Sequence, residues 1–302
     1  MNIQGENKTQ NRVVALLPLW VVIGIFMIGP LLVMAVVSLM KSNVYGGVHF
    51  EFSLNGYKQI LFDTNLFGER EFNPAYVIII GRSFVLASLA TIISFIIGFP
   101  AAYYISRQSK KVKDILIFLV TVPFWTNLLI RTFAWIIILG KGGVIESSFI
   151  FLGFINEGDT LNLMYTNSAI LIGLVYSYLP LMVLPIYASM EKMDMRLLEA
   201  AADLYSSRIS LIRKVILPLS MPGIIGGCIL VFVPCLGAFI APDLLGGGKK
   251  LLLGSLIQFQ FASARNWSFG AAVAMVLLLL VILVLFFNAR INKKHRDYET
   301  QG

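Results

Sequence analysis

The sequence predicts an all-α membrane protein with six transmembrane helices and both termini in the cytoplasm. The chain has 302 residues, of which 58% are hydrophobic and only 13% are charged, whereas soluble domains carry roughly 25% charged residues. The mean hydropathy is +0.82, and a soluble fold of this composition would leave too much apolar surface exposed to water. Long apolar runs alternate with short basic clusters, which is typical of a polytopic membrane protein.

Six apolar segments are long enough to cross a bilayer as helices, which takes about 20 residues. They span residues 13–40, 76–105, 115–139, 168–190, 219–245 and 269–289. The first segment is too long for a signal peptide and lacks a small-residue cleavage site, so we expect it to be a retained helix. We find no internal repeat, and we predict a single transmembrane domain over residues 1–302.

The basic residues predict how these helices are oriented. With the N-terminus in the cytoplasm, fifteen of the 24 Lys and Arg residues lie on the cytoplasmic side and seven on the outer side. The remaining two, Arg82 and Arg131, lie within helices. Because cytoplasmic loops of membrane proteins carry an excess of Lys and Arg, this asymmetry favours two cytoplasmic termini.

Several other functions are disfavoured by the residues themselves. The net charge of +8 is distributed between membrane segments, which argues against a nucleic-acid partner. The stretch "GGGKK" at 246–250 lacks the first glycine and the Ser or Thr of a phosphate loop. His49 and His295 have no plausible metal partners. We therefore expect no metal site, no cofactor bound by this chain and no catalytic residues.

Ionisable groups are almost absent from the predicted helices. Asp243, near the end of the fifth segment, is the one carboxylate there. A secondary carrier driven by protons or sodium ions usually has ionisable groups at bilayer depth. A channel or carrier acting alone is therefore the less favoured alternative, and a transporter built on this chain would draw its energy from another subunit.

The longest predicted cytoplasmic loop, at about 191–218, has the pattern of short amphipathic helices. Its apolar residues recur at spacings of three and four. The helix that contains Glu199, Ala200 and Ala201 could dock in a groove of a soluble partner, because small side chains allow close backbone approach. The alternative is a loop helix that packs only against its own chain.

This loop, "EAAADLYSSRISLIRKVILPLSMPGI", resembles the EAA loop of ABC importer permeases. Glu199, Ala200 and Ala201 match the start of that motif, and Leu217 with Pro218 matches its end. Tyr205 stands where the family has a glycine, which leaves the local turn geometry open. The resemblance implies a type I ABC importer permease (MetI-like) fold. It also implies that Glu199, Ala200, Ala201, Leu204 and Tyr205 form the contact with the ATPase.

Further stretches resemble the spermidine/putrescine permeases of the PotB type within that family. These stretches are "PFWTNLLIRTFAWIIILG", "GLVYSYLPLMVLPIYASMEKMD", "DLLGGGKKLLLGSLIQFQF" and "NWSFGAA". The resemblance implies a polyamine importer in the bacterial cytoplasmic membrane. Its implied partners are a PotC-type permease, two ATPase subunits that hold ATP and Mg, and an extracytoplasmic substrate-binding protein. An importer of another small solute is the alternative that shares this machinery.

A polycation needs carboxylates and aromatic faces to replace its water. The candidates along a substrate path are therefore Asp243, Trp125, Asn127, Tyr176 and Tyr178. Asp243 would contact the substrate at the outer gate, or else pair with Lys249 or Lys250. Arg131 is an expensive charge inside a membrane segment. We expect it to be a gating or structural residue paired with a carboxylate or with backbone carbonyls.

Overall fold

The structure is a computed structural model that describes residues 17–43, 45–64, 70–156, 159–193 and 207–299. The chain divides into two compact units. One unit comprises Met1–Pro74 and Ile257–Leu279, and the other comprises Ala75–Leu256 and Leu280–Gly302. Each unit is described by itself below, and the single domain expected from the sequence stays a prediction.

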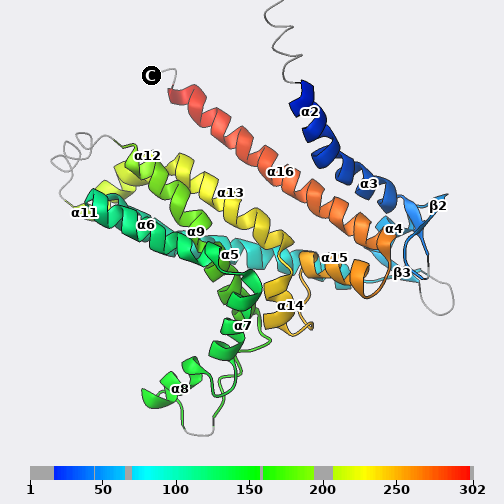
Figure 1. The fold of residues 1–302 in the computed structure, drawn as a ribbon, viewed down its shortest axis with the longest axis horizontal. Helices are drawn as coiled ribbons and strands as arrows, with labels where there is room; N and C mark the ends of the chain where they lie inside the picture. Colours follow the sequence, from blue (N-terminus) through cyan, green and yellow to red (C-terminus); the bar gives the residue numbers. More distant parts are fainter. Residues whose placement is uncertain (1–16, 44, 65–69, 157–158, 194–206, 300–302) are drawn as a thin grey trace, which may run out of the picture. The chain divides into compact units, whose positions relative to one another are not determined.

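Three long helices form the centre of the larger unit: α5 (Ala75–Ser106), α9 (Asn167–Glu191) and α13 (Met221–Gly237). They pack against one another in all three pairings (Figure 1). Because lipid is as apolar as these helices, the hydrophobic effect does not favour helix–helix contact over helix–lipid contact. Close packing of the side chains therefore holds the three helices together.

Small residues make that packing possible. Met182 of α9 is completely buried. A side chain at Gly98 of α5 would lie 3.0 Å from Met182, and one at Gly227 of α13 would lie 2.9 Å from its sulfur atom. Met182 therefore fills the space that two glycines leave open on the neighbouring helices, which matches the preference for small residues at helix contacts in membranes.

The remaining helices of this unit are shorter. They are α6 (Lys110–Trp125), α7 (Leu128–Leu139), α8 (Val144–Phe151), α11 (Arg208–Leu211), η2 (Ile212–Ile216), α12 (Leu217–Leu219) and α14 (Ile240–Gly246). Helices α15 (Leu253–Ala262) and α16 (Trp267–Glu299) contribute residues to both units.

Two of the predicted continuous segments are broken. The third, 115–139, is interrupted at Thr126 and Asn127, where α6 ends and α7 begins. The fifth, 219–245, is interrupted at Ala238 and Phe239, between α13 and α14. The prediction of two continuous helices was wrong because an apolar composition indicates that a segment can lie in lipid. It does not indicate whether the segment is helical throughout.

The smaller unit begins with α2 (Leu17–Ile23), η1 (Gly24–Ile28) and α3 (Gly29–Ser38). Two antiparallel hairpins follow, which the sequence did not predict. The first pairs β1 (Met40–Ser42) with β2 (Val48–Phe52), and the second pairs β3 (Phe62–Thr64) with β4 (Arg70–Phe72). The short helix α4 (Asn55–Lys58) lies between them in sequence.

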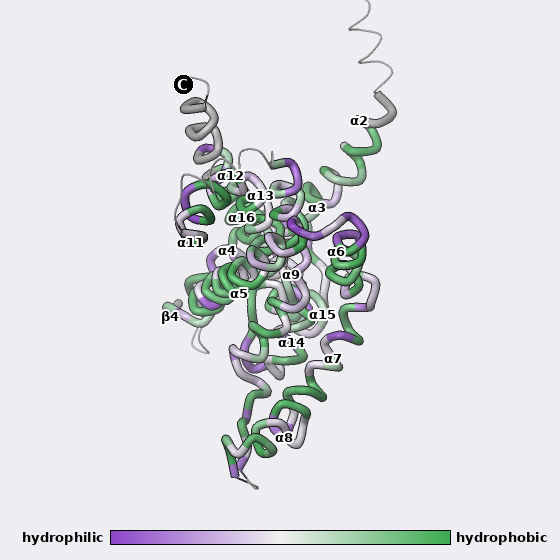
Figure 2. The backbone as a smooth tube through the Cα atoms, turned by 90° about the vertical axis from the view of Figure 1, so that its left-hand side faces the viewer, coloured by the Kyte–Doolittle hydropathy of each residue, from purple (hydrophilic) through white to green (hydrophobic). Residues whose placement is uncertain are grey.

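Five helical stretches are long and apolar enough to cross a membrane: Trp20–Ser38, Ala75–Ser106, Leu128–Phe151, Asn167–Glu191 and Trp267–Arg290. A sixth is possible if the bent pair Ile209–Leu219 and Met221–Gly237 counts as one span. Figure 2 shows hydrophobic residues along most of α2 and α5 and hydrophilic residues at the start of α6. The described residues thus agree with a helical membrane fold of up to six spans.

Prolines explain two wide helical turns. The π-helical turn η1 closes with a hydrogen bond from the Gly29 amide to the Gly24 carbonyl, directly before Pro30. The turn η2 closes in the same way between Leu217 and Ile212, directly before Pro218. Proline has no amide hydrogen and clashes with the carbonyl four residues earlier. Widening the preceding turn relieves that clash without breaking the helix.

We predict that Gly223→Ala destabilises the protein. A Cβ atom at Gly223 would overlap the carbonyl oxygen of Pro185 and lie 2.6 Å from the Cβ of Ser189. Neither atom is the flexible end of a side chain, so α13 and α9 would have to separate, at a cost of about 1–3 kcal/mol. Thermal unfolding of the detergent-purified protein measures the effect.

Gly226→Ala is the matched control on the same helix. Its Cβ would come no closer than 4.0 Å to Pro185. Alanine is also the better helix former by about 1 kcal/mol, so this variant should be at least as stable as the wild type. Equal stability of the two variants would contradict the packing argument.

Candidate functional site

The two helix breaks lie at one place in the larger unit. Helix α14 packs against both α7 and α9. The first residue of α7, Leu128, and the break residues Ala238 and Phe239 line the same cavity. One candidate span, Leu128–Phe151, begins directly after the first break, and the helix Met221–Gly237 ends directly before the second. Irregular backbone at the ends of two apolar helices, beside one cavity, marks this region as the candidate functional site.

At the first break, local side chains form hydrogen bonds with the backbone groups that the helices leave unpaired. Thr126 and Asn127 have extended backbones, with ψ angles of 144° and 136°. The Thr126 hydroxyl donates to the Pro123 carbonyl at 2.9 Å. The Asn127 side-chain oxygen accepts a hydrogen bond from the Leu129 amide at 2.8 Å, so Asn127 is the N-cap of α7.

The second break depends on tertiary contact instead. Ala238 is extended, with a ψ angle of 135°, and Phe239 caps α14 without a side-chain hydrogen bond. A side chain at Gly254, in the first turn of α15, would overlap the Gly237 carbonyl oxygen and lie 2.6 Å from that of Ala238. The unwound backbone of the second break thus lies directly against α15, and only glycine allows that approach.

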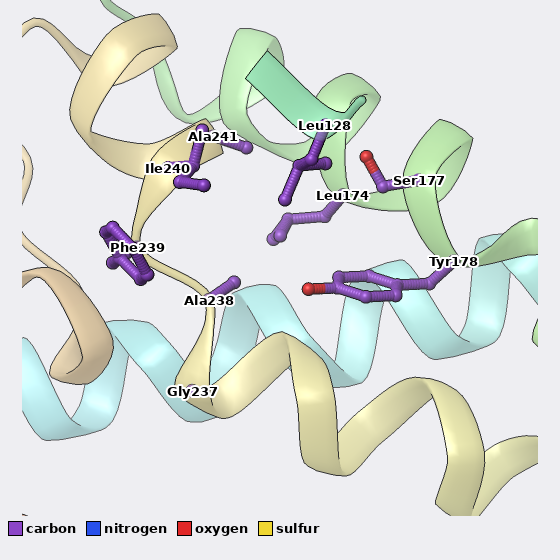
Figure 3. Close-up of a pocket in the computed structure, with 9 residues that line it drawn as sticks. All are labelled: Leu128, Leu174, Ser177, Tyr178, Gly237, Ala238, Phe239, Ile240 and Ala241. Carbon is purple, nitrogen blue, oxygen red and sulfur yellow. The ribbon is translucent and has the colours of Figure 1, made fainter. Parts of the chain in front are cut away.

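The cavity between these elements has a volume of about 130 Å³. Leu128, Leu174, Ser177, Tyr178 and the segment from Gly237 to Ala241 line it. Figure 3 shows Tyr178 extending its ring across the cavity, with the hydroxyl directed toward the segment at Gly237 and Ala238. Several water molecules would fit in this volume, but the enclosed space is small for an organic ligand.

Arg131 lies one turn into α7 and donates its backbone amide to the Asn127 carbonyl at 3.2 Å. Its Nε and Nη1 atoms are buried and have no hydrogen-bond partner among the described residues. The guanidinium is close enough to Tyr178 to act on its hydroxyl electrostatically. Within the described residues, the carboxylate or carbonyl partner expected from the sequence is therefore not found for these two atoms.

Of the predicted substrate-path residues, only Tyr178 lines the cavity. Trp125, at the end of α6, is 80% exposed, and Asn127 is exposed. Tyr176 packs its ring edge against Trp135 of α7, with ring centroids 5.5 Å apart. Asp243 is exposed on α14. The structure thus brings together Tyr178 and Arg131 but none of the other four.

Of the two roles expected for Asp243, the contact with the substrate at the outer gate stays a prediction, and the structure bears on the pairing with a lysine. Asp243 belongs to α14 and not to the end of a continuous fifth helix. Among the described residues, no ion pair joins Asp243 to Lys249 or Lys250. Its carboxylate remains free to contact a partner.

The predicted ATPase contact lies outside the described residues, which exclude 194–206. This applies to Glu199, Ala200, Ala201, Leu204 and Tyr205. The part that follows is helical through α11, η2 and α12, as the amphipathic pattern predicted. It then bends by 70° into α13, at the Ser220 position between Pro218 and Pro222.

Comparison with known proteins establishes the family. Residues 94–297 match the family described as "Binding-protein-dependent transport system inner membrane component". The chain belongs to this family. The predicted resemblance to ABC importer permeases and the predicted location in a bacterial inner membrane are thereby confirmed.

Similar proteins cover nearly the whole chain. The spermidine/putrescine transport system permease protein PotB of Haemophilus influenzae is 41% identical, over 95% of this chain and 96% of that protein. PotB of Escherichia coli is 38% identical, over 91% of this chain and 96% of that protein. The Escherichia coli inner membrane permease protein YdcU is 34% identical over 73% of this chain and 74% of its own length.

Solved structures confirm the predicted permease fold. A bacterial ABC transporter that imports alginate has a chain that matches with a TM-score of 0.71 at 14% identity, covering 97% of this chain and 99% of its own. The MetNI methionine ABC transporter matches with a TM-score of 0.53 at 18% identity, covering 72% and 94%. At these identities the likeness concerns the fold alone. The orientation of the termini stays a prediction.

Sequence reasoning missed most of the cavity lining. Leu128, Leu174, Ser177 and the segment at 237–241 were not singled out, because apolar residues in a membrane helix look alike whether they face lipid or a cavity. One available signal was the spacing of Pro234, Gly237 and Pro242 within a single apolar run. Such an interruption by Gly and Pro is the best sequence pointer to a site in a membrane transporter.

We predict that Gly254→Ala impairs transport by this permease while the protein still reaches the membrane. The added methyl group would push the second break away from α15 and distort the cavity. We expect a loss of transport of about tenfold or more, since displacing a functional group by about 1 Å can cost about 100-fold. Uptake of radiolabelled solute into cells or proteoliposomes measures it.

Gly81→Ala provides the comparison, because nothing lies within 4 Å of a Cβ at that position. It should transport at the wild-type rate. Normal transport by Gly254→Ala would show that the position of the break is not important for function.

Proposed function

We propose that this chain is a permease subunit of an ATP-driven ABC importer for polyamines, moving spermidine or putrescine from a binding protein into the cytoplasm. The observation that carries the proposal is the set of relatives named spermidine/putrescine permeases, which are 36–41% identical over at least 91% of this chain. Because this identity extends over nearly the whole chain, it includes the helices that would form the pathway as well as the coupling loop.

ATP binding and hydrolysis, with the associated Mg, belong in this proposal to two partner ATPase subunits. A PotC-type permease would form the other half of the pathway, and an extracytoplasmic binding protein would deliver the substrate. The solved alginate transporter with its periplasmic protein supports this arrangement, since its permease chain shares the fold. Both termini would face the cytoplasm, as the distribution of basic residues favours.

The cavity fits a closed gate better than a binding site for a cation. None of the described residues that line it is charged. The start of α7 presents the positive end of a helix dipole there, and the Arg131 guanidinium lies nearby. A polycation would be repelled from this space at rest. The two helix breaks would supply the hinges that open the gate, because extended residues between helices can change φ and ψ without breaking helical hydrogen bonds.

Acceptors for the ammonium groups would come from elsewhere on the path. The Tyr178 ring provides a cation–π face once the gate has opened. Asp243 carries an exposed carboxylate on α14. The remaining carboxylates would belong to the partner permease and the binding protein. A buried, uncompensated arginine is expensive in a membrane, so the unpaired atoms of Arg131 would be satisfied by a group of the partner permease.

The ATPase activity of the reconstituted four-component complex tests the proposal. We predict that spermidine or putrescine with binding protein stimulates ATPase activity several-fold, because loaded binding protein favours the state in which the ATPases close. We further predict that Glu199→Ala abolishes this stimulation, since Glu199 heads the predicted ATPase contact.

A complex without binding protein gives the basal rate, and an unrelated amino acid is the control solute. The importer would be confirmed with a different substrate if another solute stimulated ATPase activity and neither polyamine did. That result would support the alternative of an importer for another small solute. Full stimulation in Glu199→Ala would remove that residue from the coupling path.

A cluster of side chains joins the proposed coupling loop to the gate helices. Lys113 of α6 forms an ion pair with Glu191, the last residue of α9, with Nζ and Oε1 3.3 Å apart. Glu191 also interacts with the Tyr187 side chain, and Lys113 lies 5.8 Å from the centre of the Tyr187 ring. Glu191 leads into the predicted ATPase contact, while α6 leads to the first break and to Leu128 at the cavity.

This cluster would transmit movement of the loop to the gate. The Lys113 side chain is only 18% exposed, so its charge is less screened than in a surface pair. We predict that Lys113→Glu uncouples ATP hydrolysis from transport by placing two carboxylates together. The double variant Lys113→Glu with Glu191→Lys should recover most of the transport per ATP. The measured quantity is the ratio of polyamine uptake to phosphate release.

Lys41→Glu is the matched control, because the Lys41–Glu51 pair has the same length of 3.3 Å but is more than half exposed on both sides. Exposed pairs of this kind contribute about 0–1 kcal/mol, and this one is remote in sequence from the coupling loop. If the double variant transported no better than the single variant, the ion pair would have no coupling role.

A further inference from the structure

The hairpin of β1 and β2 has an apolar face and a charged face. Met40 pairs with Phe52 and Ser42 with Val48, and the register shifts between Met40 and Lys41, so Phe50 and Glu51 have no directly paired residue on β1. Alternation along β2 places Val48, Phe50 and Phe52 on one face. Lys41 pairs with His49, and Glu51 lies on their face, where it forms an ion pair with Lys41. The alternation is that of a strand pair with one face toward water and one toward an apolar environment.

The apolar face is uncovered within the described residues. Phe50 is 92% exposed and Phe52 is 77% exposed, and Tyr45 in the connecting turn is 86% exposed. An isolated two-stranded hairpin is marginally stable in water, and an exposed cluster of large aromatic side chains marks a contact with a protein or a membrane. The face therefore has an occupant in the cell.

Two membrane spans fix the position of this hairpin. The span Trp20–Ser38 ends two residues before β1 begins. The amide of Ser53, directly after β2, donates to the carbonyl of Leu39 at 2.8 Å. The hydroxyl of Ser268, in the first turn of α16, donates to the carbonyl of Met40. The base of the hairpin is thus tied to the end of one span and the start of another, at the boundary between hydrocarbon and water.

We propose that the β1–β2 hairpin lies on the membrane surface, with Tyr45, Phe50 and Phe52 inserted between lipid headgroups. The hairpin directly follows the span Trp20–Ser38, of whose most apolar window only 6% is buried within the protein. Amphipathic aromatic rings are enriched at this level of a bilayer. The ion pair of Lys41 and Glu51 stays on the aqueous face. The inference rests on the membership of this chain in an inner-membrane family and does not depend on which solute is transported.

Photo-crosslinking within the assembled importer tests this placement. Benzoylphenylalanine replaces Phe50 in one variant and Glu51 in the matched control, which lies one residue away on the opposite face. Each complex is reconstituted in nanodiscs of phosphatidylethanolamine and phosphatidylglycerol, irradiated with and without binding protein, and analysed by mass spectrometry. We predict about fivefold more lipid adduct at position 50 than at position 51, because only the former faces the headgroups.

Phe52 is the second position if the Phe50 variant does not assemble, since both residues share the apolar face. Lipid adducts at 50 or 52 that persist when binding protein is added would support the proposal. Equal lipid adducts at 50 and 51 would overturn it. Adducts at 50 with the binding protein or with the partner permease, in place of lipid, would assign the apolar face to a protein contact and would also overturn it.

Discussion

Inside a bilayer every backbone amide and carbonyl has to find its partner within the protein, and the structure depends on this constraint. It explains why the apolar segments form helices and why two of the prolines, Pro30 and Pro218, follow wide turns. The turns before Pro30 and Pro218 keep their hydrogen bonds by reaching back five residues. Where the chain departs from a helix, the Asn127 side chain accepts the Leu129 amide at the first break, and α15 lies directly against the backbone at Ala238.

Those departures coincide with the region where function is expected. Two interruptions lie at the ends of apolar helices beside one cavity. The first is stabilised by its own side chains, and the second lies against Gly254, where a Cβ atom would not fit. A gate requires such an arrangement: segments able to change conformation, held in one conformation by contacts that a movement of neighbouring helices can release.

The sequence predicted the class of fold and the family well, because both depend on features of consecutive residues along the chain. Helix length, hydropathy and the motif at Glu199–Ala201 can be recognised without knowing which residues are in tertiary contact. The candidate site was predicted less well. Tyr178, predicted on the substrate path, lines the cavity in the structure. Trp125 and Tyr176 were chosen for their aromatic character and lie outside the cavity lining. Residue type alone does not tell which side of a membrane helix faces lipid.

By itself the sequence determined that this chain is a helical inner-membrane permease, because composition and motif spacing are local properties that the bilayer turns directly into helices. Only the tertiary structure decided where those helices are interrupted and which side chains meet. The positions of Leu128, Tyr178 and the Gly237–Ala241 segment around one cavity depend on the packing of α7, α9 and α14. That packing depends on the shapes of the surfaces: Gly173 of α9 has no Cβ atom and so leaves room for Leu245 of α14. In lipid, apolar side chains gain nothing from meeting one another, so the fit of their surfaces selects the partners.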